Sequence, residues 1–296
     1  MSKFLATCFL FVAGLGAQPR QEPPFRLPDS AQRLENLVYA QYGARELRLD
    51  LYLPKDGRGP FPAVVYIHGG GWSGGSKNAF SRQAAHMATK GFVGACIEYR
   101  LSGEAPFPAA VYDSKAAVRW LRANAAKYRI DPGRIGAAGG SAGGHLVAML
   151  GTSSHVTDLE GDGGNAAMSS RVQAVAAFNP AVDLVGFGKG APGNGQNAVT
   201  RFLGGSYAEK PDAWAKATPL THVSARSAPL LALHGTSDGT VPYSHSVQLV
   251  EELKASGVRA ELFTAEGAGH GFFNRPPWFE PTLERMEKFF MEALRK

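Results

Sequence analysis

Cysteines, long apolar runs and clusters of basic residues are all scarce in this chain of 296 residues. Its two cysteines are Cys8 and Cys96. If an export signal that includes Cys8 is removed, Cys96 stays alone and the mature chain has no disulfide within it. Cys96 lies in the apolar run of residues 92–97, so we expect a buried thiol without a catalytic role.

The distribution of charge and the spacing of possible metal ligands argue against a nucleic-acid-binding protein and against a metal-binding protein. The formal net charge is +6 and the pI is about 9.3, but no run of five or six basic residues concentrates this charge. We therefore predict a mildly basic surface and no nucleic-acid partner. Histidines and acidic residues are scattered without H-x-x-x-H or similar spacing, so we predict no metal site, and no motif indicates a cofactor. No residue pattern predicts an oligomeric state.

The N-terminus has the order of residues that is typical of export signals. Lys3 precedes an apolar stretch over residues 4–15, which is too short to span a bilayer, and small residues extend to Ala17. We predict a signal peptide over residues 1–17 and a secreted or periplasmic mature protein with no stable membrane span. An uncleaved N-terminal anchor is the alternative.

The remaining residues have the composition of a single α/β domain, with 44% hydrophobic residues and 36 glycines. Residues 18–38 are polar and rich in proline and arginine, and we predict a mobile lead-in there. After it, apolar runs alternate with segments of helical periodicity. This alternation predicts a mostly parallel central sheet with helices on both faces. Residues 152–170 and 183–226 interrupt it, and we expect these insertions to be irregular and to form a small lid.

The predicted strands and helices can be given by their residue ranges. Buried strands are predicted at residues 63–67, 92–99, 172–178 and 230–234, further strands at residues 135–138 and 259–264, and a half-exposed strand at residues 45–53. Helices are predicted at residues 79–90, 109–125, 142–150, 243–255 and 281–294.

A G-x-S-x-G motif at residues 139–143 is the strongest functional signal. It follows a predicted strand and precedes a predicted helix, which is the context of a nucleophile elbow. Ser141 is therefore the candidate nucleophile. A similar run at residues 204–208 ends in alanine and follows no predicted strand, so we discount it.

A serine nucleophile needs a base, and on this kind of fold the order along the chain is serine, acid, histidine. His270 lies in a glycine-rich loop after a predicted strand and is the predicted base, whereas its rival His245 lies within a predicted helix. Asp238 follows another predicted strand and is the predicted acid. Its rival is Asp183, which also follows a buried strand.

Residues 68–72, His-Gly-Gly-Gly-Trp, follow a buried strand and predict an oxyanion hole. We assign its donors to the N–H groups of Gly70, Gly71 and Ala142. A phosphate-binding loop is excluded because no Lys-Ser/Thr pair accompanies the glycines. We expect His68 to have a structural role.

Aromatic residues close to these motifs are candidate substrate contacts. We name Trp72, Phe272 and Trp214, with Phe273 and Trp278 as neighbours. Ordinary packing is the alternative for each of them.

With these residues placed, the chain resembles the α/β-hydrolase esterases from about residue 39 to residue 294. Four motifs match in order, at residues 68–72, 139–145, 234–242 and 269–272. Within that superfamily the chain is most similar to the bacterial feruloyl and acetyl-xylan esterase-like group. It departs from the hormone-sensitive-lipase-like group, which usually has aspartate where this chain has Gly140.

The resemblance implies an α/β-hydrolase catalytic domain over residues 39–296 and a serine carboxylesterase with a Ser-Asp-His triad and an acyl-enzyme intermediate. It also implies a small ester or an esterified carbohydrate as substrate, with acetyl or feruloyl groups removed from plant polysaccharides. The alternatives are a short-chain carboxylesterase or arylesterase, a formamidase and, less favoured, a serine exopeptidase. A non-catalytic module is disfavoured because all three triad positions are filled.

Overall fold

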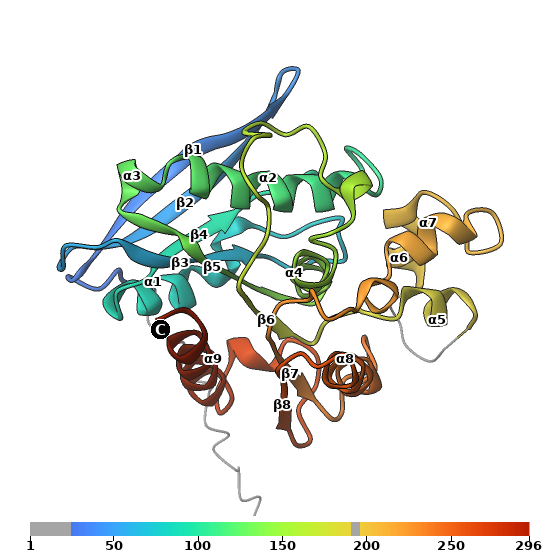
Figure 1. The fold of residues 1–296 in the computed structure, drawn as a ribbon. Coiled ribbons are helices and arrows are strands. Elements are labelled where there is room, and N and C mark those ends of the chain that lie inside the picture. Colours follow the sequence, from blue (N-terminus) through green and yellow to red (C-terminus); the bar gives the residue numbers. More distant parts are fainter. Residues whose placement is uncertain (1–24, 191–195, 296) are drawn as a thin grey trace, which may run out of the picture.

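The computed structural model describes residues 25–190 and 196–295 (Figure 1). The predicted signal peptide over residues 1–17 lies outside them. In the part described, one sheet of eight strands has the order β1-β2-β4-β3-β5-β6-β7-β8, and helices cover both of its faces. The predicted architecture of a mostly parallel sheet between helices is confirmed.

The six strands from β4 to β8 in this order are all parallel, and an antiparallel pair, β1 and β2, extends the sheet at one edge. The strands are β1 Ala31–Tyr42, β2 Arg45–Pro54, β3 Phe61–Ile67, β4 Val93–Ile97, β5 Ile130–Gly140, β6 Ala174–Phe178, β7 Leu230–Gly235 and β8 Ala260–Ala265. Because the parallel strands all run the same way, their carboxyl ends meet at one edge, where the loops that follow them come together.

Two predictions at the antiparallel edge are wrong. The lead-in predicted over residues 18–38 ends earlier, because β1 begins at Ala31 and pairs with β2. Its pairing shifts register twice, and Asn36 at the first shift has a φ of 58° and donates its N–H to Asp50 (2.8 Å). Strand β2, predicted to be half exposed, is buried from Leu49 onward because it lies between β1 and β4.

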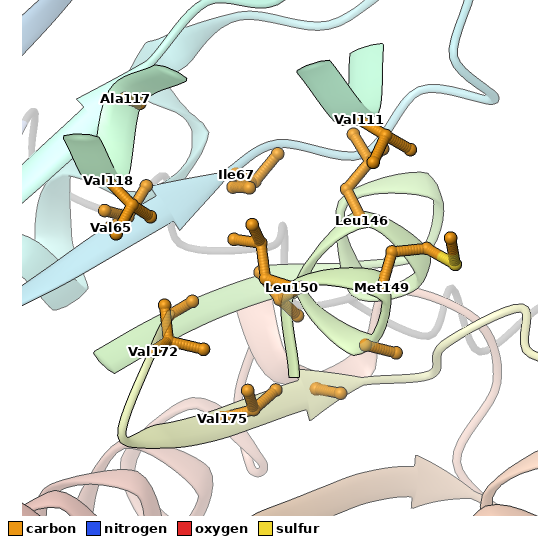
Figure 2. Close-up of a cluster of buried hydrophobic side chains, with 14 of the residues drawn as sticks. Val65, Ile67, Val111, Ala117, Val118, Leu146, Met149, Leu150, Val172 and Val175 are labelled. Atoms are coloured by element: carbon orange, nitrogen blue, oxygen red, sulfur yellow. The ribbon is translucent and has the colours of Figure 1, made fainter. Parts of the chain in front are cut away.

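Helices α1 and α9 pack on one face of the sheet and α2, α4 and α8 on the other. The alternation along β3 explains this division: Val65 and Ile67 join the cluster of α2 and α4, whereas Val64 and Tyr66 join that of α1 and α9. Figure 2 shows the first cluster, in which Leu146 and Leu150 of α4 lie between the sheet and α2. The helices are α1 Ser81–Thr89, α2 Ala109–Ala123, α3 Ala125–Tyr128, α4 Ala142–Thr152, α5 Leu184–Gly188, α6 Gln196–Leu203, α7 Pro211–Lys216, α8 Ser244–Ala255 and α9 Phe279–Leu294.

The insertion at residues 183–226 is not irregular as predicted. It contains α5, α6 and α7, which Figure 1 shows grouped at the side of the molecule next to α4. Trp214 of α7 is fully buried at 0% exposure, and its Nε1 donates to the carbonyl of Gly205 (3.1 Å). The buried Trp214 thus joins these short helices to the hydrophobic cluster that α2 and α4 form with the sheet.

Candidate active site

Ser141 lies in the turn between β5 and α4. Its φ of 57° and ψ of −119° are unusual for a residue with a side chain, and strain of this kind clusters at functional sites. The turn is held by hydrogen bonds from the Ser141 N–H to Phe178 O and from the His145 N–H to Ser141 O, both 2.9 Å long. A Cβ at Gly143 would lie 2.1 Å from Ile67 O, so only glycine lets α4 start this close to β3.

The structure brings Ser141, His270 and Asp238 into one hydrogen-bonded chain. The Nε2 of His270 lies 2.9 Å from Ser141 Oγ, and its Nδ1 lies 2.7 Å from Asp238 Oδ2. Asp238 follows β7 and His270 follows β8, so both come from loops at the carboxyl edge of the sheet, next to the elbow that follows β5. These are the distances at which a histidine can take a proton from a serine while an acid holds its other nitrogen.

The surroundings of Asp238 favour its negatively charged form. Its side chain is 0% exposed, and its Oδ1 accepts the N–H groups of Thr240 (2.8 Å) and Val241 (3.0 Å). Burial alone would raise the pKa of Asp238, but the hydrogen bonds from His234, His270 and the Val241 N–H hold it well below the usual range of an aspartate. His234, whose Nε2 lies 3.3 Å from Asp238 Oδ2, is a supporting residue that the sequence did not reveal.

The rival acid and base have other partners. Asp183 caps α5, where its Oδ1 accepts the N–H of Gly186 (2.7 Å). His245 is buried in α8, and its Nδ1 accepts the N–H of Val182 (3.1 Å). Burial lowers the pKa of His245 to about 4, so it is neutral at pH 7.

The glycine loop after β3 lies beside Ser141. Gly70 and Gly71 line the same cavity as Ser141, and in the described part of the chain their N–H groups donate to no other group. Ala142 is the first residue of α4, so its N–H has no acceptor within the helix and lies at the positive end of the helix dipole. All three predicted oxyanion donors therefore lie close to the serine and are free of other hydrogen bonds.

Trp72 anchors the glycine loop from behind. Its Nε1 donates to Nδ1 of His145 (3.2 Å), and its ring stacks on Phe202 of α6 with 4.7 Å between the centroids. The Nε2 of His145 in turn bonds Ala217 O (2.7 Å), at the end of α7. The insertion helices thus support the loop through Trp72 and His145. His68 also has a structural role, because its buried ring stacks on Tyr99 with 4.4 Å between centroids.

The cavity at Ser141 has a volume of about 450 Å³ and combines apolar walls with a few polar groups. Phe80 and Phe273 form the aromatic wall, with their ring centroids 5.7 Å apart. The remaining lining residues are Gly69, Gly70, Gly71, Ala79, Gly140, Asn179, Thr240, His270, Gly271 and Asn274. An apolar pocket of this size with a few convergent polar groups is typical of a small-molecule site.

The structure does not place the three predicted aromatic contacts in this cavity, which corrects that prediction. Trp72, Phe272 and Trp214 are 3%, 6% and 0% exposed and pack inside the protein. Their backbones are near the motifs, but their side chains point into the core. The neighbour Phe273 does reach the cavity, while Trp278 packs on Phe272.

Residues 49–253 match the model of the family BD-FAE. The chain belongs to this family. It is 37% identical over 148 residues to the carboxylesterase NlhH of Mycobacterium tuberculosis, an overlap of 50% of this chain and 46% of that protein. The chain spans about half the length of the curated relatives it matches.

Solved structures cover more of the chain. A truncated carbohydrate esterase from gut microbiota superposes with a TM-score of 0.79 and 30% identity over 90% of this chain and 97% of the other. Esterase 2 of Thermogutta terrifontis superposes with a TM-score of 0.76 and 33% identity over 89% of this chain and 92% of the other. The predicted α/β-hydrolase fold and the resemblance to its esterases are confirmed.

Asn179 and Phe80 are site residues that the sequence analysis missed. Asn179 directly follows β6, so a polar residue at the carboxyl end of a buried strand was the available signal. Phe80 ends a short 3-10 helix over Lys77–Phe80 and lines the cavity, but it belongs to none of the motifs, so no sequence signal marked it.

Two negative findings concern the described residues alone. Within residues 25–190 and 196–295, no three or more His, Cys, Asp or Glu side chains are grouped closely enough to hold a metal ion. Over the same residues, no helix has the length and apolar character needed to cross a membrane.

Proposed function

We propose that this chain is a serine carboxylic-ester hydrolase in which Ser141, His270 and Asp238 form the catalytic triad. The observation that supports this most directly is the hydrogen-bonded chain from Ser141 Oγ through His270 to a buried Asp238, at the edge of a cavity. The family and its relatives supply the reaction class.

The geometry supports a two-step acyl transfer. His270 Nε2 takes the proton of Ser141 Oγ as the oxygen attacks the ester carbonyl carbon. The oxyanion accepts hydrogen bonds from the N–H groups of Gly70, Gly71 and Ala142, and His270 then protonates the leaving alcohol oxygen. In the second step His270 takes a proton from water as the water oxygen attacks the acyl carbon, and His270 then returns that proton to Ser141 Oγ as the bond between Ser141 and the acyl group breaks and the free acid leaves.

We propose that the enzyme removes acetyl or feruloyl groups from plant polysaccharides, so that acetate or ferulate is the acid released. The support is the family match and the similarity to a protein described as a carbohydrate esterase. A short-chain carboxylesterase is the second candidate, because structures of the similar Thermogutta esterase are described as bound to propionate and to butyrate. Formamidase or exopeptidase activity has no comparable support.

The test compares the wild type with Ser141→Ala on acetylated xylan, methyl ferulate, a p-nitrophenyl ester length series and an aminoacyl amide. We expect hydrolysis by the wild type and its loss in Ser141→Ala; turnover retained by that variant would refute the triad. Relative kcat/KM chooses among the substrates. Release of acetate from xylan supports the polysaccharide proposal, whereas activity confined to the small p-nitrophenyl esters favours the short-chain esterase.

We also propose that the protein is exported through the predicted signal over residues 1–17. N-terminal sequencing of protein recovered from the medium or periplasm should begin close to Gln18. Recovery of the intact N-terminus in the membrane fraction would favour the uncleaved anchor.

A further inference from the structure

Asn179 lies over the face of the imidazole of His270. Its Nδ2 lies 3.3 Å from His270 Nδ1 and 3.4 Å from Nε2, so it is nearly equidistant from the two ring nitrogens. An atom in the ring plane cannot stand this close to both nitrogens without overlapping a ring carbon. Both nitrogens also have other partners already, Asp238 and Ser141. The carboxamide of Asn179 therefore contacts the π face and takes no in-plane hydrogen bond from the triad.

Asn179 makes this contact with a strained backbone and with a buried side-chain oxygen that has no hydrogen-bond partner in the described part of the chain. It is 0% exposed and its φ is 35°, a left-handed value that a non-glycine residue adopts only at a cost. Its N–H is tied to Leu233 O of β7 (2.7 Å), which fixes the backbone between two strands. Its Oδ1 is buried and has no hydrogen-bond partner in the described part of the chain. A strained backbone and an unsatisfied amide oxygen each destabilise the folded protein.

We propose that Asn179 is a positioning residue for His270. Its carboxamide holds the imidazole in the plane where Nδ1 meets Asp238 and Nε2 meets Ser141. This inference rests on the proposed function, because the positioning matters only if His270 is the base.

A charge added beside the His270 ring should have a measurable effect, because few charged groups of the described residues contact this ring. Among the described residues, Asp238 from the loop after β7 is the charged group in contact with His270, while the elbow presents the Ser141 hydroxyl and β6 presents the Asn179 amide. A second negative charge at residue 179 would therefore be felt by the ring directly.

Two variants test the proposal on p-nitrophenyl acetate. Asn179→Gly removes the carboxamide and still permits the positive φ. We expect kcat to fall by about tenfold or more with KM within about twofold, because the base is less well oriented. Asn179→Asp keeps the shape and adds a negative charge that stabilises the imidazolium. We expect the acidic limb of the kcat/KM profile to move to higher pH by about one unit or more.

Asn165→Gly is the matched control, because Asn165 also has a positive φ, of 51°, but lies exposed in the insertion after α4. Its kcat and pH profile should equal those of the wild type. The proposal is overturned if Asn179→Gly keeps the wild-type kcat and profile. If Asn179→Gly fails to fold, the test relies on Asn179→Asp. The proposal is then overturned if the acidic limb of the kcat/KM profile of Asn179→Asp lies at the same pH as that of the wild type. Activity in Ser141→Ala would instead refute the proposed function, so the two failures are distinguishable.

Discussion

The ring of Phe273 occupies the space that a side chain at Gly140 would need. A Cβ at Gly140 would stand 2.5 Å from Phe273 Cζ, closer than real Cβ contacts allow. The ring has little room to move away, because it packs on Phe178 and Phe80 with centroid distances of 4.6 and 5.7 Å. The residue before the nucleophile and the aromatic wall of the cavity are thus parts of one packing arrangement.

Gly140→Ala should therefore cost about 1–3 kcal/mol of unfolding free energy through overpacking and should lower kcat/KM by displacing the elbow. Phe273→Leu shortens the opposing side chain. In that background we expect Gly140→Ala to cost less, so a double-mutant cycle measured by denaturant unfolding should give a coupling of about 0.5 kcal/mol or more. Strictly additive effects would show that the two residues do not compete for this space.

Asp238→Asn should reduce kcat by about 10⁴-fold, because the amide cannot hold the required tautomer of His270 or stabilise its cation. Asp183→Asn is the matched control at the rival acid. Asparagine caps a helix about as well as aspartate, so this variant should retain both α5 and activity. Steady-state kinetics on one ester suffices, and an inverted pattern would transfer the role of the acid to Asp183.

Gly75→Ala should damage the oxyanion loop without touching the triad. A Cβ at Gly75, whose φ is 107°, would lie 2.3 Å from both Gly69 O and His68 Nδ1. The loop must shift to relieve this, and displacement of even one oxyanion donor costs about 10²–10³ in kcat. Gly103→Ala, at an exposed turn with nothing within 4 Å of the added Cβ, should leave the kinetics unchanged. Similar kinetics for both variants would show that the loop tolerates the added methyl.

Acid should destabilise the fold through two buried histidines. Burial lowers the pKa of His145 and of His245 to about 4, below the unfolded value of 6.5. Their contribution is fully present above pH 6.5 and is lost as the pH falls toward 4, where the unfolded chain binds protons that the folded one excludes. The loss is on the order of 2–3 kcal/mol for each histidine.

Thermal unfolding measured from pH 7 to pH 4 checks this, with His145→Gln as the comparison. The variant should be less stable at pH 7, but its stability should fall less steeply across the window, since one of the buried histidines with a lowered pKa is gone. An equally steep loss in the variant would contradict the assignment.

The sequence predicted which polar residues meet at the candidate site better than it predicted the residues that line the cavity. Ser141, Asp238 and His270 follow strands whose carboxyl ends must meet at one edge of a parallel sheet, so local motifs sufficed to predict that these side chains come together. The direction of an aromatic side chain depends on tertiary packing, and therefore Phe272 points into the core while Phe273 lines the cavity. Asn179 carries no motif, and its place over His270 results from the pairing of β6 with β7.

Strand β1 and the helices of the insertion were missed for different reasons. The register shifts in β1 break the strict alternation by which a half-exposed strand is detected, so its polar residues were taken for a lead-in. The glycines and prolines between α5, α6 and α7 concealed helices of only 5, 8 and 6 residues. Helices this short depend on burial of residues such as Trp214, which periodicity does not reveal.

The anchoring of Trp72 by Phe202 and of His145 by Ala217 O has a consequence for engineering. In a chimaera of this protein, residues 183–226 could be replaced by the equivalent segment of another esterase. Such a chimaera keeps its own glycine loop but loses the Phe202 ring and the Ala217 carbonyl that hold this loop in place. The donor segment must bring a stacking partner for Trp72 and an acceptor for His145, or the oxyanion hole is left unsupported. The insertion is therefore part of the scaffold of the proposed active site and cannot be exchanged as an independent unit.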